Sequence, residues 1–324
     1  MPIVPNVRRA LPVLLPLLLL ATLLAACRRE PEELAGATSE PAAAVRELVD
    51  HLRRDDLAGF ARAAVPPADH AALETAWRED RSRWPLTELP LSRQLVPMLA
   101  VLSKPGSEQA LMRDFNRQFA RQERDLREAA RSMGLFGVQY LKKEGDYTPT
   151  QRLHYTQVVQ TTSEWAQTAP LADPALARNT INRMTAAARK AGLTSDADLR
   201  EAGMDGSLRR LAPVFAETKA SFARYGLPLE ATLADLRTGL VEQNGDRATV
   251  RIHYPLGNRE IDSQVSLERR EGRWYLSDYL RAAEKARATA PSSPPAAAPD
   301  TSAPETPSPS TPPATPPAQA VKRA

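Results

Sequence analysis

Apolar residues recur at helical spacing through the middle of the chain. A first helix is predicted over 41–52, because apolar side chains stand there at i, i+3, i+4 and i+7: Val45, Leu48, Val49 and Leu52. A short second piece around Leu57 and Phe60 is expected to end before Pro66. Further helices are predicted near 69–83, 91–103, 149–168, 174–191 and 205–225.

The pattern changes to alternating apolar and polar residues after Gly226. Three short runs alternate, with apolar members Ala248, Val250, Ile252 and Tyr254, then Ile261, Val265 and Leu267, then Trp274 and Leu276. Turn residues separate the runs at 244–246, 255–258 and 271–272. The leucines from Leu229 to Glu242 have helical spacing, but the turn after them requires a strand, which we expect in the second half. The chain is therefore predicted to be α+β, helix-rich to about 226 and followed by a C-terminal antiparallel β-meander over about 234–280.

Composition sets both ends apart from this folded domain, which is predicted over 42–288. Residues 10–26 form an apolar run preceded by Arg8 and Arg9, the arrangement of a secretory signal peptide over 1–26. Two prolines interrupt the run and it is short for a membrane-spanning helix, so cleavage is favoured over a permanent span. Residues 27–41 are predicted to be a flexible linker, and the Pro/Ala/Ser/Thr-rich segment 289–324 is expected to be a disordered tail.

The signal ends in Leu24-Ala25-Ala26-Cys27, which resembles the lipobox of bacterial lipoproteins. The resemblance implies cleavage between Ala26 and Cys27, and lipidation of Cys27 with several acyl chains such as palmitate. Two or more chains anchor a protein stably, since each buried methylene contributes about 0.8 kcal/mol. Cys27 is the only cysteine, so no disulfide can form within the chain and acylation would remove the free thiol. The alternative is an incidental cysteine in a signal that is cut elsewhere.

Arg28 follows the cysteine, where enterobacterial lipoproteins retained in the inner membrane tend to carry aspartate. The resemblance therefore favours an outer-membrane lipoprotein facing the periplasm, with the inner membrane and the cell surface as alternatives. The formal charge of +4 falls to about +2 without Arg8 and Arg9, and this mild balance indicates no nucleic-acid partner.

Known catalytic and cofactor patterns are absent from the sequence. His51, His70, His154 and His253 have no metal-ligand spacing among themselves or with Cys27. No HExxH, phosphate-binding loop, dinucleotide glycine pattern or G-x-S-x-G occurs. Asp55 and Asp56 would point about 100° apart on a helix, so we expect them to cap the helix that follows. The sequence predicts no catalytic residue, no metal ligand and no cofactor.

Two separate segments resemble secreted proteins of the nuclear-transport-factor-2-like, cystatin-like fold. They are the helix that begins Val45-Arg46-Glu47-Leu48 and the late phrases at 244–250 and 271–274. In that family an N-terminal helix packs on a curved antiparallel sheet, and both enzymes and binding modules occur. The long helical stretch between the two segments would have to be an insertion or an additional helical domain.

A basic helix face is the most informative pattern in the middle of the chain. One helix is predicted over 107–133, with arginines on one arc: Arg113, Arg117, Arg121, Arg124, Arg127 and Arg131. The opposite arc is apolar, with Leu111, Phe115, Phe119, Leu126 and Met133. Guanidinium groups bind phosphate and carboxylate, so the arginine arc is a candidate for anionic lipid, lipopolysaccharide or an acidic envelope protein. A solvated outer face with charges balanced by its neighbours is the simpler interpretation, and the one that we favour.

Three function classes follow from the sequence. The first is a non-enzymatic envelope lipoprotein whose domain binds a partner or a small ligand. The second is a structural or assembly accessory that tethers envelope layers through the Pro-rich tail, although an unselected tail is the simpler interpretation. The third is an enzyme whose site lies in the concave face of the sheet. A buried pocket with convergent polar groups would favour the third class, and an exposed apolar or arginine surface would favour the first.

Overall fold

The computed structural model describes residues 40–89, 91–144 and 147–288 and confirms the α+β class. Its helices are α2 (Glu40–Arg53), α3 (Leu57–Ala64), α4 (Pro67–Arg78), the 3₁₀ helix η2 (Leu86–Glu88), α5 (Ser92–Ser103), α6 (Ser107–Gln118), α7 (Glu123–Lys143), α8 (Pro149–Thr168), α9 (Pro174–Ala191), α10 (Asp196–Arg224), α11 (Leu229–Ala234) and α12 (Ser277–Ala288). Its strands are β1 (Arg237–Asn244), β2 (Arg247–Leu256), β3 (Arg259–Arg270) and β4 (Arg273–Leu276). The predicted signal peptide, the lipidation and cleavage positions, most of the linker and the tail lie outside the described residues.

Local capping residues explain where several helices begin. The Asp56 carboxylate accepts a hydrogen bond from the Gly59 amide at 2.8 Å, which confirms its predicted role as the N-cap of α3. Thr148 and Ser195 each form a capping box, at the starts of α8 and α10. Asp173 caps α9 through two backbone amides. These caps satisfy amide groups that the first turn of a helix leaves without a partner.

The main core lies among α3, α4, α5, α9, α10 and α12, around two buried tryptophans. Trp77 is fully buried, and its indole N–H donates to the Leu199 carbonyl at 2.8 Å. Trp84 lies beside Tyr279 of α12, with the two rings edge to face and 6.1 Å between their centroids. The last helix of the described chain is thereby packed against segments from its first third.

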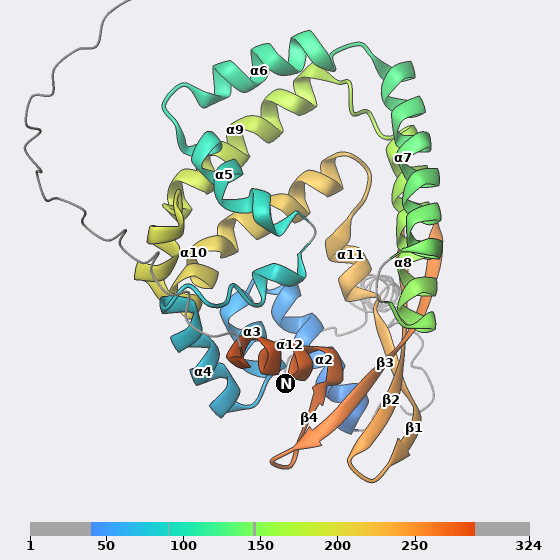
Figure 1. The fold of residues 1–324 in the computed structure, drawn as a ribbon. Coiled ribbons are helices and arrows are strands. Elements are labelled where there is room, and N and C mark those ends of the chain that lie inside the picture. The colour runs from blue at the N-terminus through green and yellow to red at the C-terminus, as the bar shows by residue number, and fades with distance from the viewer. Residues whose placement is uncertain (1–39, 90, 145–146, 289–324) are drawn as a thin grey trace, which may run out of the picture. The chain divides into compact units, whose positions relative to one another are not determined.

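The four strands form one antiparallel sheet in the order β1-β2-β3-β4, as the alternation predicted. α2 covers one face of the sheet, where its Ala42 and Val45 join an apolar cluster with Val250, Leu267 and Trp274 (Figure 1). The packing of the first helix on the sheet is therefore as expected, while membership of the nuclear-transport-factor-2-like fold stays a prediction. A second cluster joins the far end of the sheet to α8 through Leu256, Ile261, Val158 and Trp165.

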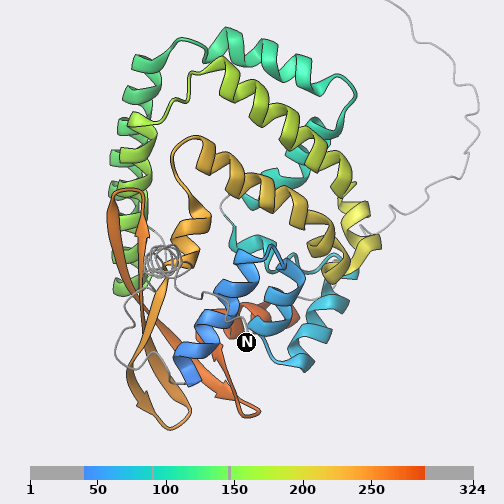
Figure 2. The same ribbon diagram turned by 180° about the vertical axis from the view of Figure 1, so that it is seen from behind.

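α7 and α8 pack side by side, and both views show them as a pair (Figures 1 and 2). Two glycines of α7 allow the close contact. A Cβ atom on Gly134 would come within 2.2 Å of the Ser163 hydroxyl, and one on Gly137 within 3.0 Å of Val159. The Ser163 hydroxyl also donates to the Ala130 carbonyl at 3.0 Å. Small residues on α7 therefore set the distance between the two helices.

The single helix predicted over 107–133 is wrong, because the chain breaks between α6 and α7. Arg121 stands in this connection with a φ of 63°, and its amide donates to the Ala172 carbonyl at 3.4 Å. α6 packs on α9 and α7 packs on α8, so the two connections lie together. Pro170 separates α8 from α9, since proline lacks an amide hydrogen and restricts the residue before it. We attribute the break at 119–122 to the need for the α6–α7 arm to follow that bend.

Other boundaries also differ from those predicted. α2 begins at Glu40, inside the predicted linker. The meander ends at Leu276 and the chain continues as α12, which was not predicted. The segment 229–242 contains the short helix α11 followed by the strand β1. This confirms the strand that was expected in its second half. α10 begins nine residues before the predicted start at 205 and is interrupted at Gly203, whose φ is 71°.

A buried lysine links α10 to α11 and to the C-terminal end of α2. The side chain of Lys219 in α10 is 7 % exposed, and its Nζ donates to the carbonyls of Leu52 and Arg53 at the end of α2. The same Nζ lies 3.0 Å from the Asp55 carboxylate and 2.7 Å from the Glu230 carboxylate of α11. One ammonium group thus satisfies carbonyls that the helix end leaves open and forms ion pairs with two carboxylates.

Replacing this lysine should destabilise the fold strongly. Lys219→Met keeps the length of the side chain but leaves carbonyl and carboxylate groups without their cation, so we expect a loss of about 3 kcal/mol in the free energy of unfolding. Urea denaturation followed by circular dichroism measures it. Lys190→Met, at an exposed position of α9, is the matched control. Equal shifts in both variants would show that Lys219 has no special role.

Candidate functional site

A cleft of about 1020 Å³ lies where α8, the outer edge of β3 and the start of α12 meet. α8 contributes Gln151, His154 and Tyr155 to its wall, and α12 contributes Asp278, Tyr279 and Arg281. β3 lines it with the six successive residues from Ser263 to Glu268, β1 and β2 line it with residues between 242 and 249, and Glu88 of η2 completes it. Segments from five separate parts of the sequence therefore build one concave surface.

An unpaired strand edge forms the floor of this cleft. β3 has twelve residues and β4 has four, and their pairing covers only Leu267 to Arg270 of β3. The hairpin turn makes Arg270 and Glu268 the residues whose backbone groups face β4. By the same period of two, Gln264 and Ser266 direct their N–H and C=O groups to this side, beyond the end of β4. Four backbone groups thus face the cleft without a strand partner.

α8 closes the next position along this edge. The side-chain amide of Gln157 donates to the Asp262 carbonyl at 3.0 Å, and its oxygen accepts from the Asp262 amide at 3.3 Å. A glutamine amide here makes the two hydrogen bonds that a neighbouring strand would make. The open edge is therefore bounded by Gln157 at one end and by β4 at the other.

A hydrogen bond between His154 and Tyr254 holds α8 to the sheet beside the cleft. The His154 Nε2 and the Tyr254 hydroxyl are 2.8 Å apart. Burial lowers the pKa of His154 and raises the pKa of Tyr254 to about 12, so both side chains are neutral near pH 7. This pair positions α8 and is engaged within the fold.

Three other groups of the cleft, Tyr155, Tyr279 and Glu88, are also shifted towards their neutral forms. Burial raises the pKa of Tyr279 to about 12, and burial followed by the charge of Asp278 raises the pKa of Tyr155. The same two causes, in the same order, raise the pKa of Glu88. Such shifts are common in functional sites. Neutral tyrosines here offer hydroxyl groups and aromatic faces to a ligand.

One hydrogen bond joins the two walls of the cleft. The Gln151 amide of α8 donates to the Asp278 carboxylate of α12 at 2.8 Å. Asp278 also pairs with Arg281 one turn later. The charged residues of the lining are four carboxylates and two guanidinium groups: Glu88, Glu242, Glu268, Asp278, Arg247 and Arg281. The cleft is thus acidic on balance, which favours a cationic ligand.

The structure does not bring the six predicted arginines onto one ridge. Arg113 and Arg117 lie on α6, Arg121 lies in the connection, and Arg124, Arg127 and Arg131 lie on α7. All six are exposed. Two have acidic partners on their own helix, Asp114 for Arg117 and Glu128 for Arg124. The predicted apolar arc is also interrupted, because Phe119 is exposed and Met133 is 73 % exposed.

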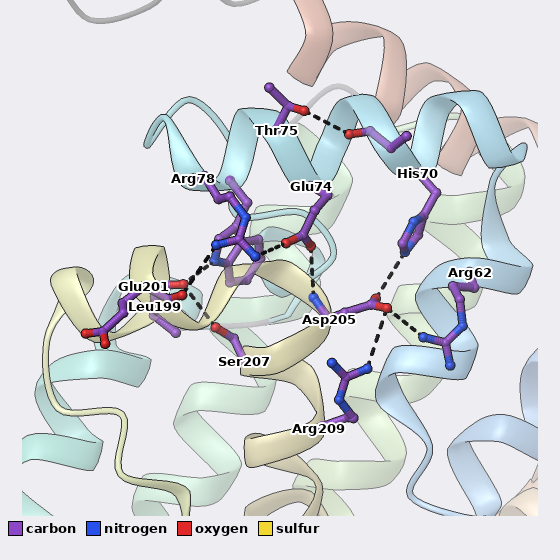
Figure 3. A network of polar contacts seen from close by, with 12 residues as sticks. Arg62, His70, Glu74, Thr75, Arg78, Leu199, Glu201, Asp205, Ser207 and Arg209 are labelled. Carbon is purple, nitrogen blue, oxygen red and sulfur yellow. Dashed lines mark hydrogen bonds and ion pairs between the residues drawn. The ribbon is translucent and has the colours of Figure 1, made fainter.

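A second polar cluster surrounds Asp205 of α10 (Figure 3). Its carboxylate lies within 3.6 Å of three basic side chains, Arg62, His70 and Arg209. Its amide donates to the Glu74 carboxylate at 3.1 Å, just after the break at Gly203. Glu74 therefore caps the second segment of α10.

This cluster has a structural explanation and lacks a nucleophile beside its histidine. The nearby Ser207 hydroxyl is fully buried and donates to the Leu199 carbonyl at 3.2 Å. Across the described ranges, no group of three or more His, Cys, Asp and Glu side chains is placed to hold a metal ion. None of the helices in the described part has the length and apolarity needed to cross a bilayer.

Sequence reasoning missed the cleft residues, since Glu88, Gln151, Tyr155 and Asp278 match no motif and come from distant segments. His253, one of the four histidines without metal-ligand spacing, is 22 % exposed and pairs with Glu260 at 2.8 Å. A usable signal was the spacing of the turns. The turns at 257–258 and 271–272 give β3 its twelve residues, and recognising α12 would have shown that β4 is much shorter.

Acid should weaken the attachment of α8 to the sheet. Because the pKa of His154 is lowered in the native state, the unfolded chain binds a proton more readily once the pH falls below about 6.5. Stability should therefore decrease as the pH falls from 7.5 to 5.5, and decrease less in His154→Gln, which retains a hydrogen-bonding group for Tyr254. Urea unfolding at both pH values measures the difference. The same decrease in both proteins would contradict this role of His154.

Comparison with protein-family models, curated proteins and solved structures finds no match to this chain.

Proposed function

We propose that the protein is an outer-membrane lipoprotein, anchored through Cys27 and facing the periplasm, whose folded domain is a non-enzymatic binding module. The lipobox resemblance at Leu24-Ala25-Ala26-Cys27 supports the anchor. The cleft between α8, β3 and α12 supports the binding role, and it is the single observation that carries that role. Anchor and cleft are separate features, and each is tested on its own.

The groups around the cleft favour binding over chemistry. A general base must be free to take a proton at the working pH. The His154 Nε2 is engaged with Tyr254, and Asp278 is engaged with Gln151 and Arg281. The raised pKa values keep Tyr254 and Tyr279 protonated near pH 7. What the cleft offers instead is an open row of backbone groups with polar and aromatic side chains around it, which is the composition of a recognition site.

Lipidation at Cys27 is tested in a host that processes lipoproteins. The parent chain should incorporate an alkyne-labelled palmitate and sediment with membranes, because only the acyl chains hold it there. Cys27→Ser should lose the label completely, since serine lacks the thiol that receives the lipid. Ala25→Gly keeps a small residue before the cleavage position and serves as the control. Label in the serine variant, or none in the parent, would refute the anchor.

The arginines of α7 carry a second candidate function, contact with an anionic lipid surface. Arg124, Arg127 and Arg131 are spaced at i, i+3 and i+7, so they share one side of the helix. Lys142 returns to that side three turns after Arg131, and Leu135 lies on it one turn after Arg131, 62 % exposed. Cations around an exposed apolar side chain fit the headgroup region of an anionic membrane. This surface keeps half of the predicted arginine arc and leaves α6 out.

Charge reversal separates the two helices in a vesicle-binding assay. In the unlipidated chain 28–324, Arg124→Glu combined with Arg131→Glu should reduce sedimentation with phosphatidylglycerol vesicles at least fivefold, because the phosphates then meet like charges. Arg113→Glu combined with Arg117→Glu, on α6, should leave it within twofold of the parent. Equal losses in the two variants would show that the arginines of α6 and α7 bind the vesicles together. No loss in either variant would leave the arginines as a solvated face.

A further inference from the structure

We infer that the open edge of β3 binds an extended, positively charged peptide segment of a partner protein as an added strand. This inference rests on the proposed binding role of the cleft, and it is independent of the lipid anchor. It names the ligand class, the backbone atoms that recognise it and the source of its charge preference.

The backbone geometry supplies the first argument. Gln264 and Ser266 each direct one N–H and one C=O group into the cleft, and a peptide in line with β4 would pair with all four. Exposed strand edges are templates for such pairing. The open positions between Gln157 and β4 are residues 263 to 266, three strand steps or about 10 Å, so about four residues of a bound peptide pair with the edge and its ends extend beyond it. Gln157 already shows that this edge accepts amide groups at the position of a neighbouring strand.

The end of β4 determines where the added strand would begin. Leu276 pairs with Leu267, and the next residue, Ser277, already belongs to α12. The chain therefore leaves the edge of the sheet at the point where the cleft opens. A peptide placed there continues the row of β4 and needs no displacement of a strand. The Gln151–Asp278 hydrogen bond joins the two walls, and it links flexible side chains.

The charge of the lining indicates the charge that a bound peptide should carry. Glu242 pairs with Thr249, which pairs with Ser266, so these three share the polar face of the sheet beside the edge. Glu268 lies further along the same face, and Asp278 and Glu88 lie on the opposite wall. Tyr155, which is 40 % exposed, adds an aromatic ring that attracts cations. Lysine or arginine at alternate positions of the peptide would meet this acidic surface, while the positions between them need only suit a strand.

The test uses the full chain in detergent and a fluorescent hexapeptide, threonine-lysine-valine-lysine-valine-threonine, with blocked ends. Binding is followed by fluorescence anisotropy, and hydrogen exchange reports the amides of Gln264 and Ser266. The peptide should bind saturably and slow the exchange of both amides. Replacing its lysines by glutamates should weaken binding at least tenfold. Absence of binding, or equal binding by the glutamate peptide, would overturn the inference.

Methylated peptides provide the sharper control within the ligand. Only alternate amides of an added strand face β3, so methylation of both lysine amides and methylation of both valine amides must differ. One of the two peptides should bind at least tenfold more weakly than the parent, because it loses its hydrogen bonds to the edge. The other should bind within a few-fold of the parent. Equal affinities of the two methylated peptides for the unmutated protein would exclude strand addition. This test needs no protein variant.

A proline variant provides the control within the protein. Ser266→Pro removes one of the two N–H donors at the edge, and proline is tolerated at edge positions whose N–H faces outward. It should lose peptide binding at least tenfold, while Ser266→Ala, which keeps the amide, should bind as the parent does. Equal binding by these two variants would overturn the inference. If the proline variant does not fold, the methylated peptides decide the question. Failure of the peptide in a chain that still carries its lipid would leave the proposed anchor in place.

Discussion

The difference in length between β3 and β4 is the constraint on which the cleft depends. β3 has twelve residues, whereas β4 ends after four because the chain turns into α12 at Ser277. The outer edge of β3 must therefore be covered by something other than a strand, since backbone groups without partners are costly when buried and promote association when exposed. α8 covers this edge at Asp262 through Gln157, and β4 covers it from Leu267 onward. The positions between them remain beneath two helical walls without a backbone partner.

α8 is held from both sides, which makes the wall of the cleft rigid. On one side, Gly134 and Gly137 let α7 approach until any larger residue would collide with Ser163 or Val159. On the other side, the His154–Tyr254 hydrogen bond and an apolar cluster join α8 to the sheet. A site built on helices and a strand loses little conformational entropy when a ligand binds. The glycine contact on α7 is therefore part of the architecture of the cleft, although no glycine lines it.

The sequence predicted elements where the signal was local and failed where the cause lay elsewhere in the chain. Capping by Asp56, the spacing of Val45 and Leu48 and the alternation in β2 are all decided within a few residues, and each was predicted correctly. The break at Arg121 has no glycine or proline beside it, and we attribute it to the bend near Pro170 between α8 and α9. The cleft could not be predicted, because it depends on the ends of α8, β4 and α12 meeting in space. The arginines were identified, but their common ridge required a helix that does not exist.

Recognition through backbone groups sets limits on what such a cleft can do. Four hydrogen-bonding groups on Gln264 and Ser266 contribute little individually, because each replaces a hydrogen bond to water. These backbone groups recognise the extended conformation of a ligand more than its side chains. Most of the selectivity must therefore come from charge, which the acidic lining supplies. Affinity for a free peptide should then be modest. If Cys27 carries lipid as proposed, the anchor confines the domain to a thin layer beside the membrane, where the effective concentration of envelope partners is high. A weak, charge-selective edge is sufficient in that setting.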